Sequence, residues 1–307
     1  MISVHSVTKR YGTFTAVEGV SFEVGRGQIV GFIGPNGAGK TTTMRMVTGF
    51  LPASEGSISV AGHDVFEDPM SVRRAVGYLP ETPPLYAELT IGDYLQFIAE
   101  IREVPARDRT RRVGEVMAEV GLQGWERRIL GSLSKGYRQR VGLAQAIIHD
   151  PRVLILDEPT SGLDPAQVVG IRDFIRALAG TRTVVLSTHI LTEVEALCSR
   201  ALVIAKGKLL ADDSLDGLRA RAGEGLRYRI ELKGSSVVQA VAALPEVQQV
   251  SPLGVADGFE RMEVRAPNDP RTAIAALATA KGFEIRAMEK VIATLEEAFL
   301  TIVGAEA

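Results

Sequence analysis

The chain has 307 residues, of which 46% are hydrophobic and 23% are charged. This length is enough for two domains and a sizeable core, and the composition excludes disorder as the dominant state. The formal net charge is -2, which excludes a protein that binds nucleic acid through an overall positive charge.

Membrane spans and disulfides are not expected. No stretch reaches the roughly 18 apolar residues that a membrane helix needs, and the first residues lack the basic-then-apolar pattern of a signal peptide. Cys198 is the one cysteine, so no intrachain disulfide can form, and we expect it to be a small buried hydrophobic residue. If the protein works at a membrane, it does so through a partner.

The first segments are rich in Val and Ile and are separated by turns that contain glycine, which is typical of strands. We expect strands at residues 2–7, 17–24, 28–33 and 56–65. Together with the elements that follow, they are predicted to form one domain over residues 1–218.

Residues 34–41 read Gly-Pro-Asn-Gly-Ala-Gly-Lys-Thr, which is the P-loop pattern, between an apolar strand and a helical stretch. Glycines let the backbone wrap around a phosphate, and the following helix N-terminus favours an anion. Lys40 is expected to reach the β and γ phosphates of ATP, and Thr41 to bind Mg²⁺. The predicted ATP-binding residues of the loop are Gly34, Pro35, Asn36, Gly37, Ala38, Gly39, Lys40, Thr41 and Thr42.

The stretch from about 90 to 149 is expected to be helical because apolar residues recur at helical spacing. The first stripe is Tyr94, Phe97, Ile98 and Ile101, and the second is Val113, Val116, Met117 and Val120. We expect both stripes to face the core. The basic cluster of Arg107, Arg109, Arg111 and Arg112 is expected to be a solvated helix face.

The apolar strand at residues 153–156 ends in two acids, Asp157 and Glu158. Asp157 is placed to hold Mg²⁺, and a carboxylate near the γ-phosphate can polarise the attacking water. Side chains alternate along a strand, so Glu158 should point away from Asp157. A pair of acids that only caps the next turn is the structural alternative.

From residue 152 onward, short apolar strands alternate with helices near 166–179 and 191–197, which indicates a parallel sheet covered on both faces. A boundary is expected near residues 217–225. Beyond it, residues 226–307 predict a small βαββαβ domain with a terminal helix, for which Thr294 and Glu297 can form a capping box.

Residues 133–140 read Leu-Ser-Lys-Gly-Tyr-Arg-Gln-Arg. Ser134 is expected to cap a helix that runs to about Ile148, whose N-terminus makes a second anion site. From here to Asp164 the sequence closely resembles the signature and D-loop of ABC ATPases. It departs from the usual signature, Leu-Ser-Gly-Gly-Gln, at Lys135 and Tyr137.

Further matches to the ABC ATPases follow in the expected order. Tyr11 resembles the aromatic residue that stacks on adenine, and His189 resembles the switch histidine that contacts the γ-phosphate. Glu81 stands where most of the family has the glutamine of the Q-loop, and its carboxylate could also bind Mg²⁺. The resemblance implies an α/β P-loop NTPase with a RecA-like core, antiparallel β and helical subdomains, and here a small α+β C-terminal domain.

The resemblance also implies how the protein works. It would hydrolyse ATP as a homodimer or heterodimer, with ATP and Mg²⁺ bound between a P-loop and the partner's signature. Glu158 and His189 would be catalytic, and Thr41, Asp157 and Glu81 would be the metal ligands. The residues that act on the partner's ATP would be Ser134, Lys135, Gly136 and Asp164.

A separate transmembrane permease would hold the ATPase on the cytoplasmic face of the membrane, and no nucleic-acid partner is expected. Residues 77–86 and 295–300 resemble exporters of the drug-resistance and gliding-motility type. In that family the region around Pro84 and Tyr86 forms the groove for a coupling helix of the permease; a well-packed loop is the alternative.

Three other functions agree less well with the sequence. A soluble ABC-type ATPase acting on nucleic acid or ribosomes usually carries two such domains or a long coiled coil, and no heptad run occurs here. A P-loop kinase lacks the signature helix and the D-loop. A regulatory module that binds ATP without hydrolysing it is disfavoured because Lys40, Asp157, Glu158 and His189 are all present.

Overall fold

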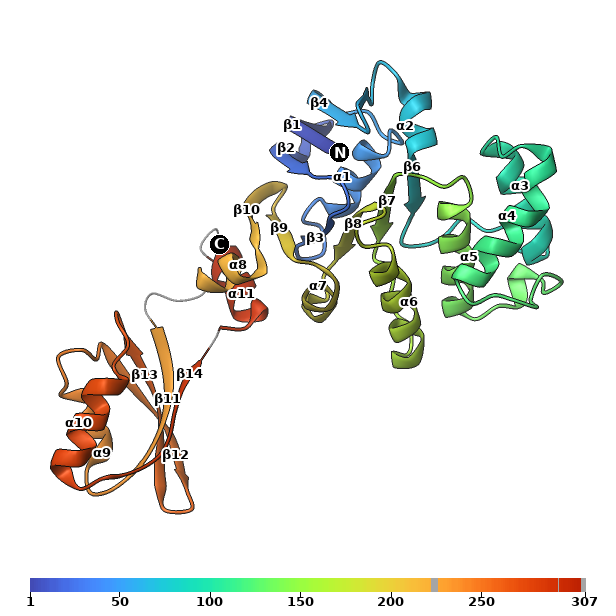
Figure 1. Ribbon diagram of the computed structural model, residues 1–307. Coiled ribbons are helices and arrows are strands. Elements are labelled where there is room, and N and C mark those ends of the chain that lie inside the picture. The colour runs from blue at the N-terminus through green and yellow to red at the C-terminus, as the bar shows by residue number, and fades with distance from the viewer. Residues whose placement is uncertain (222–225, 292, 305–307) are drawn as a thin grey trace. The chain divides into compact units, whose positions relative to one another are not determined.

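The computed structural model describes residues 1–221, 226–291 and 293–304. The chain divides into two compact units, Met1–Leu215 and Asp216–Ala307 (Figure 1). Each unit has a hydrophobic cluster of its own. Residues 222–225, which belong to the expected boundary, lie outside the described residues.

The first unit is built on a six-stranded sheet in the order β10-β9-β3-β8-β7-β6. All neighbours are parallel except β10, which runs antiparallel to β9. The strands are β3 (Ile29–Ile33), β6 (Val76–Leu79), β7 (Val153–Asp157), β8 (Thr183–Thr188), β9 (Arg200–Ala205) and β10 (Lys208–Ser214). Every residue of β3, β7 and β8 is buried, as expected for a parallel sheet covered on both faces.

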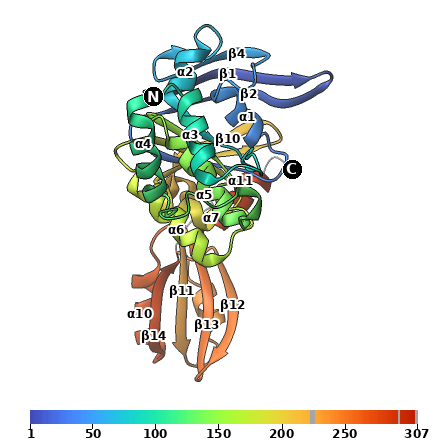
Figure 2. The same ribbon diagram turned by 90° about the vertical axis from the view of Figure 1, so that its right-hand side faces the viewer.

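A second, antiparallel sheet in the order β2-β1-β4-β5 forms the other β part of this unit. Its strands are β1 (Ile2–Tyr11), β2 (Phe14–Val24), β4 (Glu55–Val60) and β5 (His63–Asp64), and helix α2 (Pro69–Ala75) follows. Figure 2 shows β1, β2 and β4 beside α2. Asp68 caps α2 by accepting a hydrogen bond from the Ser71 amide at 3.2 Å.

Helices α3 (Ile91–Ile101), α4 (Ala106–Glu119) and α5 (Lys135–Ile147) form a helical group, with the short turn η1 (Leu130–Ser132) before α5 (Figure 1). The stripe on α4 is buried as expected. The stripe on α3 is only partly so, because Phe97 and Ile101 are 40% and 58% exposed. Of the predicted stripe only Tyr94 is buried, and the other buried residues of α3 are Ile91, Leu95 and Ala99.

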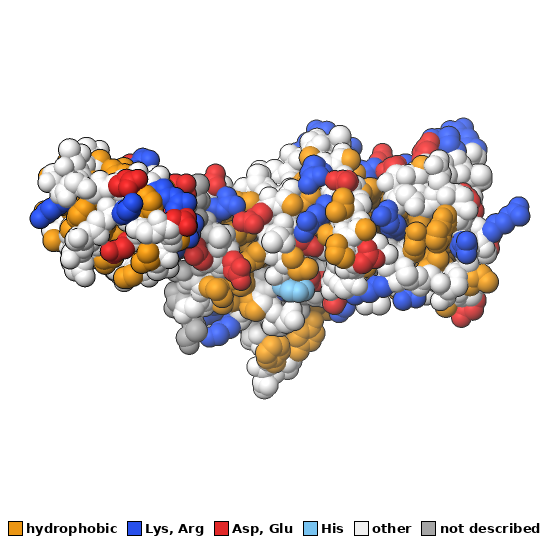
Figure 3. Space-filling view, turned by 90° about the horizontal axis from the view of Figure 1, so that it is seen from below, with side chains coloured by type: hydrophobic (Ala, Val, Ile, Leu, Met, Phe, Trp, Pro, Cys, Tyr) orange, Lys and Arg blue, Asp and Glu red, His pale blue; other side chains and the backbone are white. Residues whose placement is uncertain are grey.

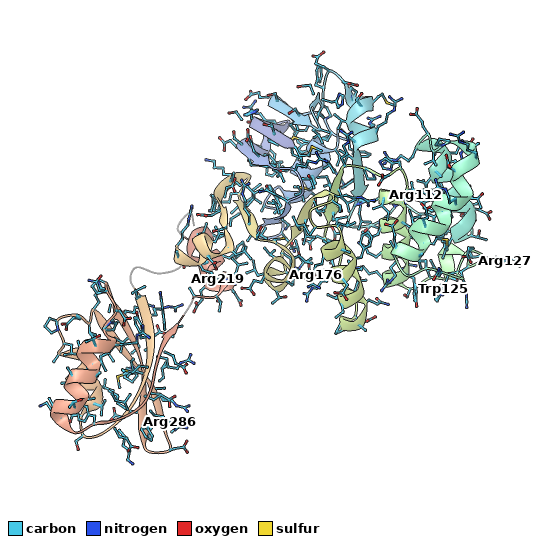
Figure 4. The ribbon with its side chains drawn as sticks, in the orientation of Figure 1. Arg112, Trp125, Arg127, Arg176, Arg219 and Arg286 are labelled. Atoms are coloured by element: carbon cyan, nitrogen blue, oxygen red, sulfur yellow. The ribbon has the colours of Figure 1, made fainter. Side chains whose placement is uncertain are left out.

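The expectation of a solvated basic face on α4 is wrong for Arg112. Its side chain is 15% exposed and lies by α5 in Figure 4. The guanidinium donates to the carbonyls of Ile147 and Ile148 at 2.8 and 3.0 Å and pairs with Glu115 and Glu119. The last carbonyls of a helix have no partner within the helix, so Arg112 supplies one for α5.

Three further helices belong to the first unit; the first and the last of them contact strands of the central sheet. They are α1 (Lys40–Val47), α6 (Pro165–Ala177) and α7 (Leu191–Leu197), and α8 (Leu215–Ala220) follows the last strand. In the described part of the chain, no helix has the length and apolar character needed to cross a bilayer.

The second unit is an antiparallel sheet in the order β12-β13-β11-β14, and helices α9 and α10 lie side by side on it (Figure 1). Its elements are β11 (Leu226–Lys233), α9 (Val237–Ala242), β12 (Gln249–Ala256), β13 (Phe259–Ala266), α10 (Arg271–Lys281), β14 (Glu284–Val291) and α11 (Leu295–Gly304). Tyr228, Ile230 and Leu232 are buried, and the residues between them carry charges. The α/β P-loop fold class with a small α+β C-terminal part is therefore confirmed.

Two local details complete this unit. Thr294 and Glu297 form the expected capping box: the Thr294 amide donates to the Glu297 carboxylate at 3.0 Å, and the Glu297 amide donates to the Thr294 hydroxyl at 3.2 Å. On the part of this unit that is drawn at the left of Figure 3, basic and acidic side chains lie intermixed.

Candidate active site

The P-loop connects β3 to α1 at the carboxyl end of the parallel strands. In the sheet register, Ile33 pairs with Thr188 and Asp157 pairs with Ser187. The P-loop and the residues that follow β7 and β8 therefore emerge at one edge of the sheet, the place where open α/β sheets bind ligands.

Two glycines of the loop are needed for its path. A Cβ atom at Gly34 would overlap the carbonyl oxygen of Ile204, and Gly39 has a φ of 103°. Larger side chains would displace the loop from β9 or strain its backbone. No side chain caps the N-terminus of α1, so its first amides are left for an anion.

Lys40 is buried at the base of the loop, with 6% of its surface exposed. Its Nζ donates to the carbonyls of Gly34 and Pro35 at 2.8 and 3.2 Å and lies 3.7 Å from Oε1 of Glu158. The loop therefore holds a cation next to a carboxylate at the end of β7.

Asp157 ends β7 and is fully buried. Its Oδ1 accepts a hydrogen bond from the Ser187 hydroxyl at 2.8 Å, and its Oδ2 is a buried oxygen with no hydrogen-bond partner in the described part of the chain. Burial raises the pKa of Asp157, while the hydroxyls of Ser187 and Thr41 lower it. A cation at Oδ2 would offset the cost of burying this charge.

These features fit Mg²⁺. Asp157 offers a carboxylate oxygen that has no hydrogen-bond partner among the described residues, and the hydroxyl of Thr41 lowers the pKa of the same carboxylate. No group of three or more acidic, His or Cys side chains among residues 1–221, 226–291 and 293–304 could hold a metal alone. Mg²⁺ commonly takes one or two protein ligands and completes its shell with phosphates and water.

Glu158 follows β7 with a φ of 50°, a left-handed conformation that few residues other than glycine adopt. Its orientation therefore comes from a turn and not from the strand alternation that the sequence suggested. The side chain is 8% exposed, and both carboxylate oxygens lie 2.9 Å from Nδ1 of His189. Glu158 is thus held between the Lys40 ammonium and the His189 ring.

These residues line an open cleft of about 570 Å³. Most of the predicted site residues meet there: Tyr11, Asn36, Gly37, Gly39, Lys40, Thr41, Thr42, Glu81, Glu158 and His189. Gly34, Pro35 and Ala38 complete the loop behind them, and Asp157 is buried at the end of β7.

Three residues of the cleft, Phe14, Ala16 and Ser161, are not among the site residues predicted from the sequence. Tyr11 and Phe14 pair across the turn between β1 and β2, and they are 49% and 64% exposed. Exposed aromatic rings beside a phosphate-binding loop can stack on a nucleobase. Two aromatic residues flanking a glycine-containing turn were the signal that could have found Phe14.

The remaining predicted residues lie away from this cleft, at the first turns of α5 and α6. A Cβ atom at Gly136 would overlap the side chain of Gln167, and one at Gly162 would lie 2.5 Å from Nζ of Lys135. Ser134 occupies the position before α5, but its side chain makes no capping hydrogen bond, so that expectation is wrong. Asp164 caps α6 through the Gln167 amide at 3.0 Å.

Tyr137, in the first turn of α5, stacks on Trp125, with ring centroids 4.1 Å apart and an angle of 20° between the planes. The Arg128 guanidinium lies over the Trp125 ring, 5.2 Å from its centroid. Figure 4 shows where Trp125 lies in the helical group. The stack joins the loop that carries Trp125 to the first turn of α5, next to residues 134–136.

A second hollow of about 720 Å³ lies between α3 and the α2–β6 segment, outside the P-loop cleft. Its walls include exposed apolar side chains, with Phe97 and Ile101 from α3 and Tyr86 from the loop before it. Arg73, Arg74, Arg102 and Glu103 lie along it. It is a groove with apolar walls and a mostly basic border.

Comparison with curated proteins finds relatives over the whole chain. BcrA, the bacitracin transport ATP-binding protein of Bacillus licheniformis, is 37% identical over 78% of this chain and 78% of its own length. DrrA3, the daunorubicin resistance ATP-binding protein of Streptomyces coeruleorubidus, is 34% identical over 99% of this chain and 96% of its own length. The second match includes the C-terminal unit.

Solved structures match the first unit. An ATP-binding subunit of an ABC transporter, 32% identical, superposes with a TM-score of 0.66 over 72% of this chain and 92% of that chain. The dimeric post-hydrolysis state of the ATP-binding cassette MJ0796, bound to ADP and Pi, has a TM-score of 0.64 over 70% of this chain and 98% of that chain. At 22% identity, the second likeness concerns the fold alone. The family described as ABC transporter matches residues 17–161, and with the relatives above this shows that the chain belongs to the ABC transporter family, as an ATP-binding and ATP-hydrolysing subunit.

Proposed function

We propose that two such ATPase subunits, identical or closely related, enclose two ATP molecules, each bound by the P-loop of one subunit and the α5 N-terminus of the other. The N-terminus of α1 without a side-chain cap, and the Ser134 hydroxyl, which makes no capping hydrogen bond to α5, support this arrangement. In each subunit, Lys135, Gly136 and Asp164 would meet the partner's nucleotide. A γ-phosphate between two helix N-termini would hold the dimer closed until hydrolysis.

Within one subunit, Tyr11 and Phe14 would stack on adenine, and the P-loop amides would bind the phosphates. Lys40 would exchange the carbonyls of its own loop for the β and γ phosphates. Thr41 and Asp157, with Glu81 nearby, would hold Mg²⁺, which neutralises charge on the transferred phosphoryl group. Glu158 would orient the attacking water, and His189 would donate to the γ-phosphate.

The contact between Glu158 and His189 carries this proposal. Glu158, just after a parallel strand, lies 2.9 Å from the His189 ring nitrogen and 3.7 Å from the Lys40 ammonium, and these two contacts fix the direction of its carboxylate. Such a group can accept a hydrogen bond from water when the phosphate draws Lys40 and His189 away.

We further propose that a transmembrane permease docks a short helix in the 720 Å³ groove, which places the ATPase on the cytoplasmic face of a membrane. Exposed apolar side chains in a groove fit the apolar face of an amphipathic helix. The similarity to BcrA and DrrA3, whose names refer to bacitracin transport and daunorubicin resistance, supports an exporter. Residues 1–218 and 226–307 would be separate domains, in line with the two compact units.

The test is Mg²⁺-dependent ATP hydrolysis at increasing protein concentration. Turnover per subunit should rise with concentration, because each complete site needs two chains. Glu158→Gln should bind ATP, lose turnover by about 10² to 10⁴-fold, and elute as a dimer in ATP. Lys40→Ala should lose both ATP binding and turnover.

Glu23→Gln is the matched control, since it makes the same change on the exposed face of β2, outside the cleft. It should keep wild-type turnover. Wild-type turnover in Glu158→Gln would remove this residue from catalysis, and turnover that is independent of concentration would contradict the two-chain site.

A further inference from the structure

A buried carboxylate that plays no part in the proposed chemistry lies close behind the cleft. Glu193, in the first turn of α7, is 1% exposed. One oxygen accepts a hydrogen bond from the Thr160 hydroxyl, and the other accepts one from the Thr188 hydroxyl at 3.1 Å. Over the described ranges of the chain, no Lys, Arg or His forms an ion pair with it.

The two threonines belong to the segments that carry the proposed catalytic groups. Thr160 lies two residues after Glu158 and begins the path into residues 161–164. Thr188 ends β8 and directly precedes His189, and its hydroxyl also accepts from the Ile190 amide at 3.0 Å. A single carboxylate therefore connects the chain after Glu158 to the chain around His189.

A carboxylate buried without a cation is costly unless its hydrogen bonds compensate. Bonds to an ionised acceptor are shorter and stronger than neutral ones, and strongest in a water-free interior. The Glu193 carboxylate thus joins the hydroxyls of Thr160 and Thr188, and through them the two segments, by hydrogen bonds. The helix dipole alone favours an acidic residue in the first turn of α7. It does not explain why both oxygens of Glu193 accept hydrogen bonds from these two hydroxyls.

We propose that Glu193 is a positioning residue, which keeps Glu158 and His189 in register and couples any movement of residues 161–164 to His189. The inference rests on the proposed function, because residues 161–164 would face the partner subunit and His189 would face the γ-phosphate. Closure of the dimer on one segment would then be transmitted to the histidine through a buried link of three side chains.

The test measures kcat, KM for ATP and equilibrium ATP binding for Glu193→Ala and Glu193→Gln. Glu193→Ala should lower kcat by about tenfold to a hundredfold, the scale of a small misplacement of catalytic groups. KM and the ATP dissociation constant should stay within about threefold, because Tyr11 and the P-loop are untouched. Glu193→Gln should recover much of kcat, since an amide can still bond to both hydroxyls.

Glu195→Ala is the matched control, because it removes the same charge from an exposed position of the same helix; its kcat should equal that of the wild type. Thr160→Val and Thr188→Val should each lower kcat, and in combination with Glu193→Ala they should add little, as expected for one network. These two variants decide the question if Glu193→Ala does not fold.

Two results would overturn the inference. One is a kcat in Glu193→Ala, or in both threonine variants, within about twofold of the wild type. The other is a loss of kcat matched by an equal loss of ATP binding, which would indicate general damage. Absence of concentration-dependent turnover in the wild type and in Glu195→Ala would instead contradict the proposed function.

Discussion

His149 follows helix α5 and donates from Nε2 to the Val76 carbonyl of β6 at 3.1 Å. Burial, and then the charge of Arg102, lower the pKa of His149 from 6.5 to about 4. Between these values the unfolded chain takes up a proton that the folded chain does not, so the free energy of unfolding falls as the pH falls. The contribution is fully present above pH 6.5, and about 2 kcal/mol of it should be lost between pH 7 and pH 5.

Urea unfolding at pH 7 and pH 5 tests this expectation. His149→Gln should show a smaller loss between the two pH values, because a glutamine amide can still donate to Val76 but does not titrate. His5→Gln, at an exposed histidine of β1, serves as the control and should behave like the wild type. Equal losses in wild type and His149→Gln would exclude His149 as the cause.

Among the site residues, those in contiguous motifs could be predicted from the sequence, because a P-loop between a strand and a helix fixes its own geometry. The catalytic and binding roles of these motif residues stay predictions. Phe14 was missed because it lies outside the contiguous motifs, and its one signal is that it pairs with Tyr11 across a glycine-containing turn. The capping role of Ser134 was wrong because the residue type shows a preference for the position, not whether the hydroxyl turns toward the amide.

At the scale of elements, Arg112 joins α4 to the end of α5. Arg112→Ala would leave the carbonyls of Ile147 and Ile148 without this donor and would separate Glu115 and Glu119 from their partner. Because these bonds involve a charged donor and are largely buried, we expect a loss of about 2 to 3 kcal/mol in the free energy of unfolding. Urea denaturation of the variant measures it.

Arg107→Ala is the matched control. Its side chain is 88% exposed and lies on the same helix, with one ion pair to Asp108 at 3.5 Å, so the expected change is under about 0.5 kcal/mol. If the two variants lost equal stability, the contact between Arg112 and α5 would not contribute to folding.

Helix α3 shows why periodicity did not predict which residues face the core. Apolar residues cover a wide arc of this helix: Tyr94 belongs both to the predicted stripe and to the buried face, which continues through Leu95, while Phe97 and Ile101 at the other edge of the stripe stay exposed. A spacing rule finds a stripe in such a helix but cannot choose between stripes. On α4, with charged residues opposite Val113, Val116 and Met117, the same rule gave the buried face correctly.

At the scale of the whole molecule, the fold class could be predicted because the hydrophobic pattern, the order of the elements and the position of the motifs all indicate the same fold. Buried apolar strands alternating with helices predict the parallel sheet, and the alternation in β11 predicts the half-buried second sheet. Helix α2 and strand β6 were not predicted. They are short, and β6 is a four-residue strand whose burial depends on β7, a neighbour far along the chain.

The two units should respond differently to nucleotide. The hydrophobic cluster of the first unit consists of buried residues between Ile2 and Ile204, and the cluster of the second consists of buried residues between Tyr228 and Ile274. The two clusters share no residue. ATP with Mg²⁺ should therefore stabilise the first unit alone, by about 2.7 kcal/mol when the ligand is at 100 times its dissociation constant. Glu158→Gln is the protein for this experiment, because it should bind ATP without consuming it.

Calorimetry reports both units, while fluorescence of Trp125, the one tryptophan of the chain, reports the first. We expect two transitions in calorimetry, of which the one that coincides with the fluorescence change moves to higher temperature with ATP and Mg²⁺. Chelation of Mg²⁺ should shrink the shift, because Asp157 Oδ2 then has no cation to offset its burial, and adding Lys40→Ala should abolish it. A single transition that moves as a whole would mean that the two units unfold together, and would contradict their independence.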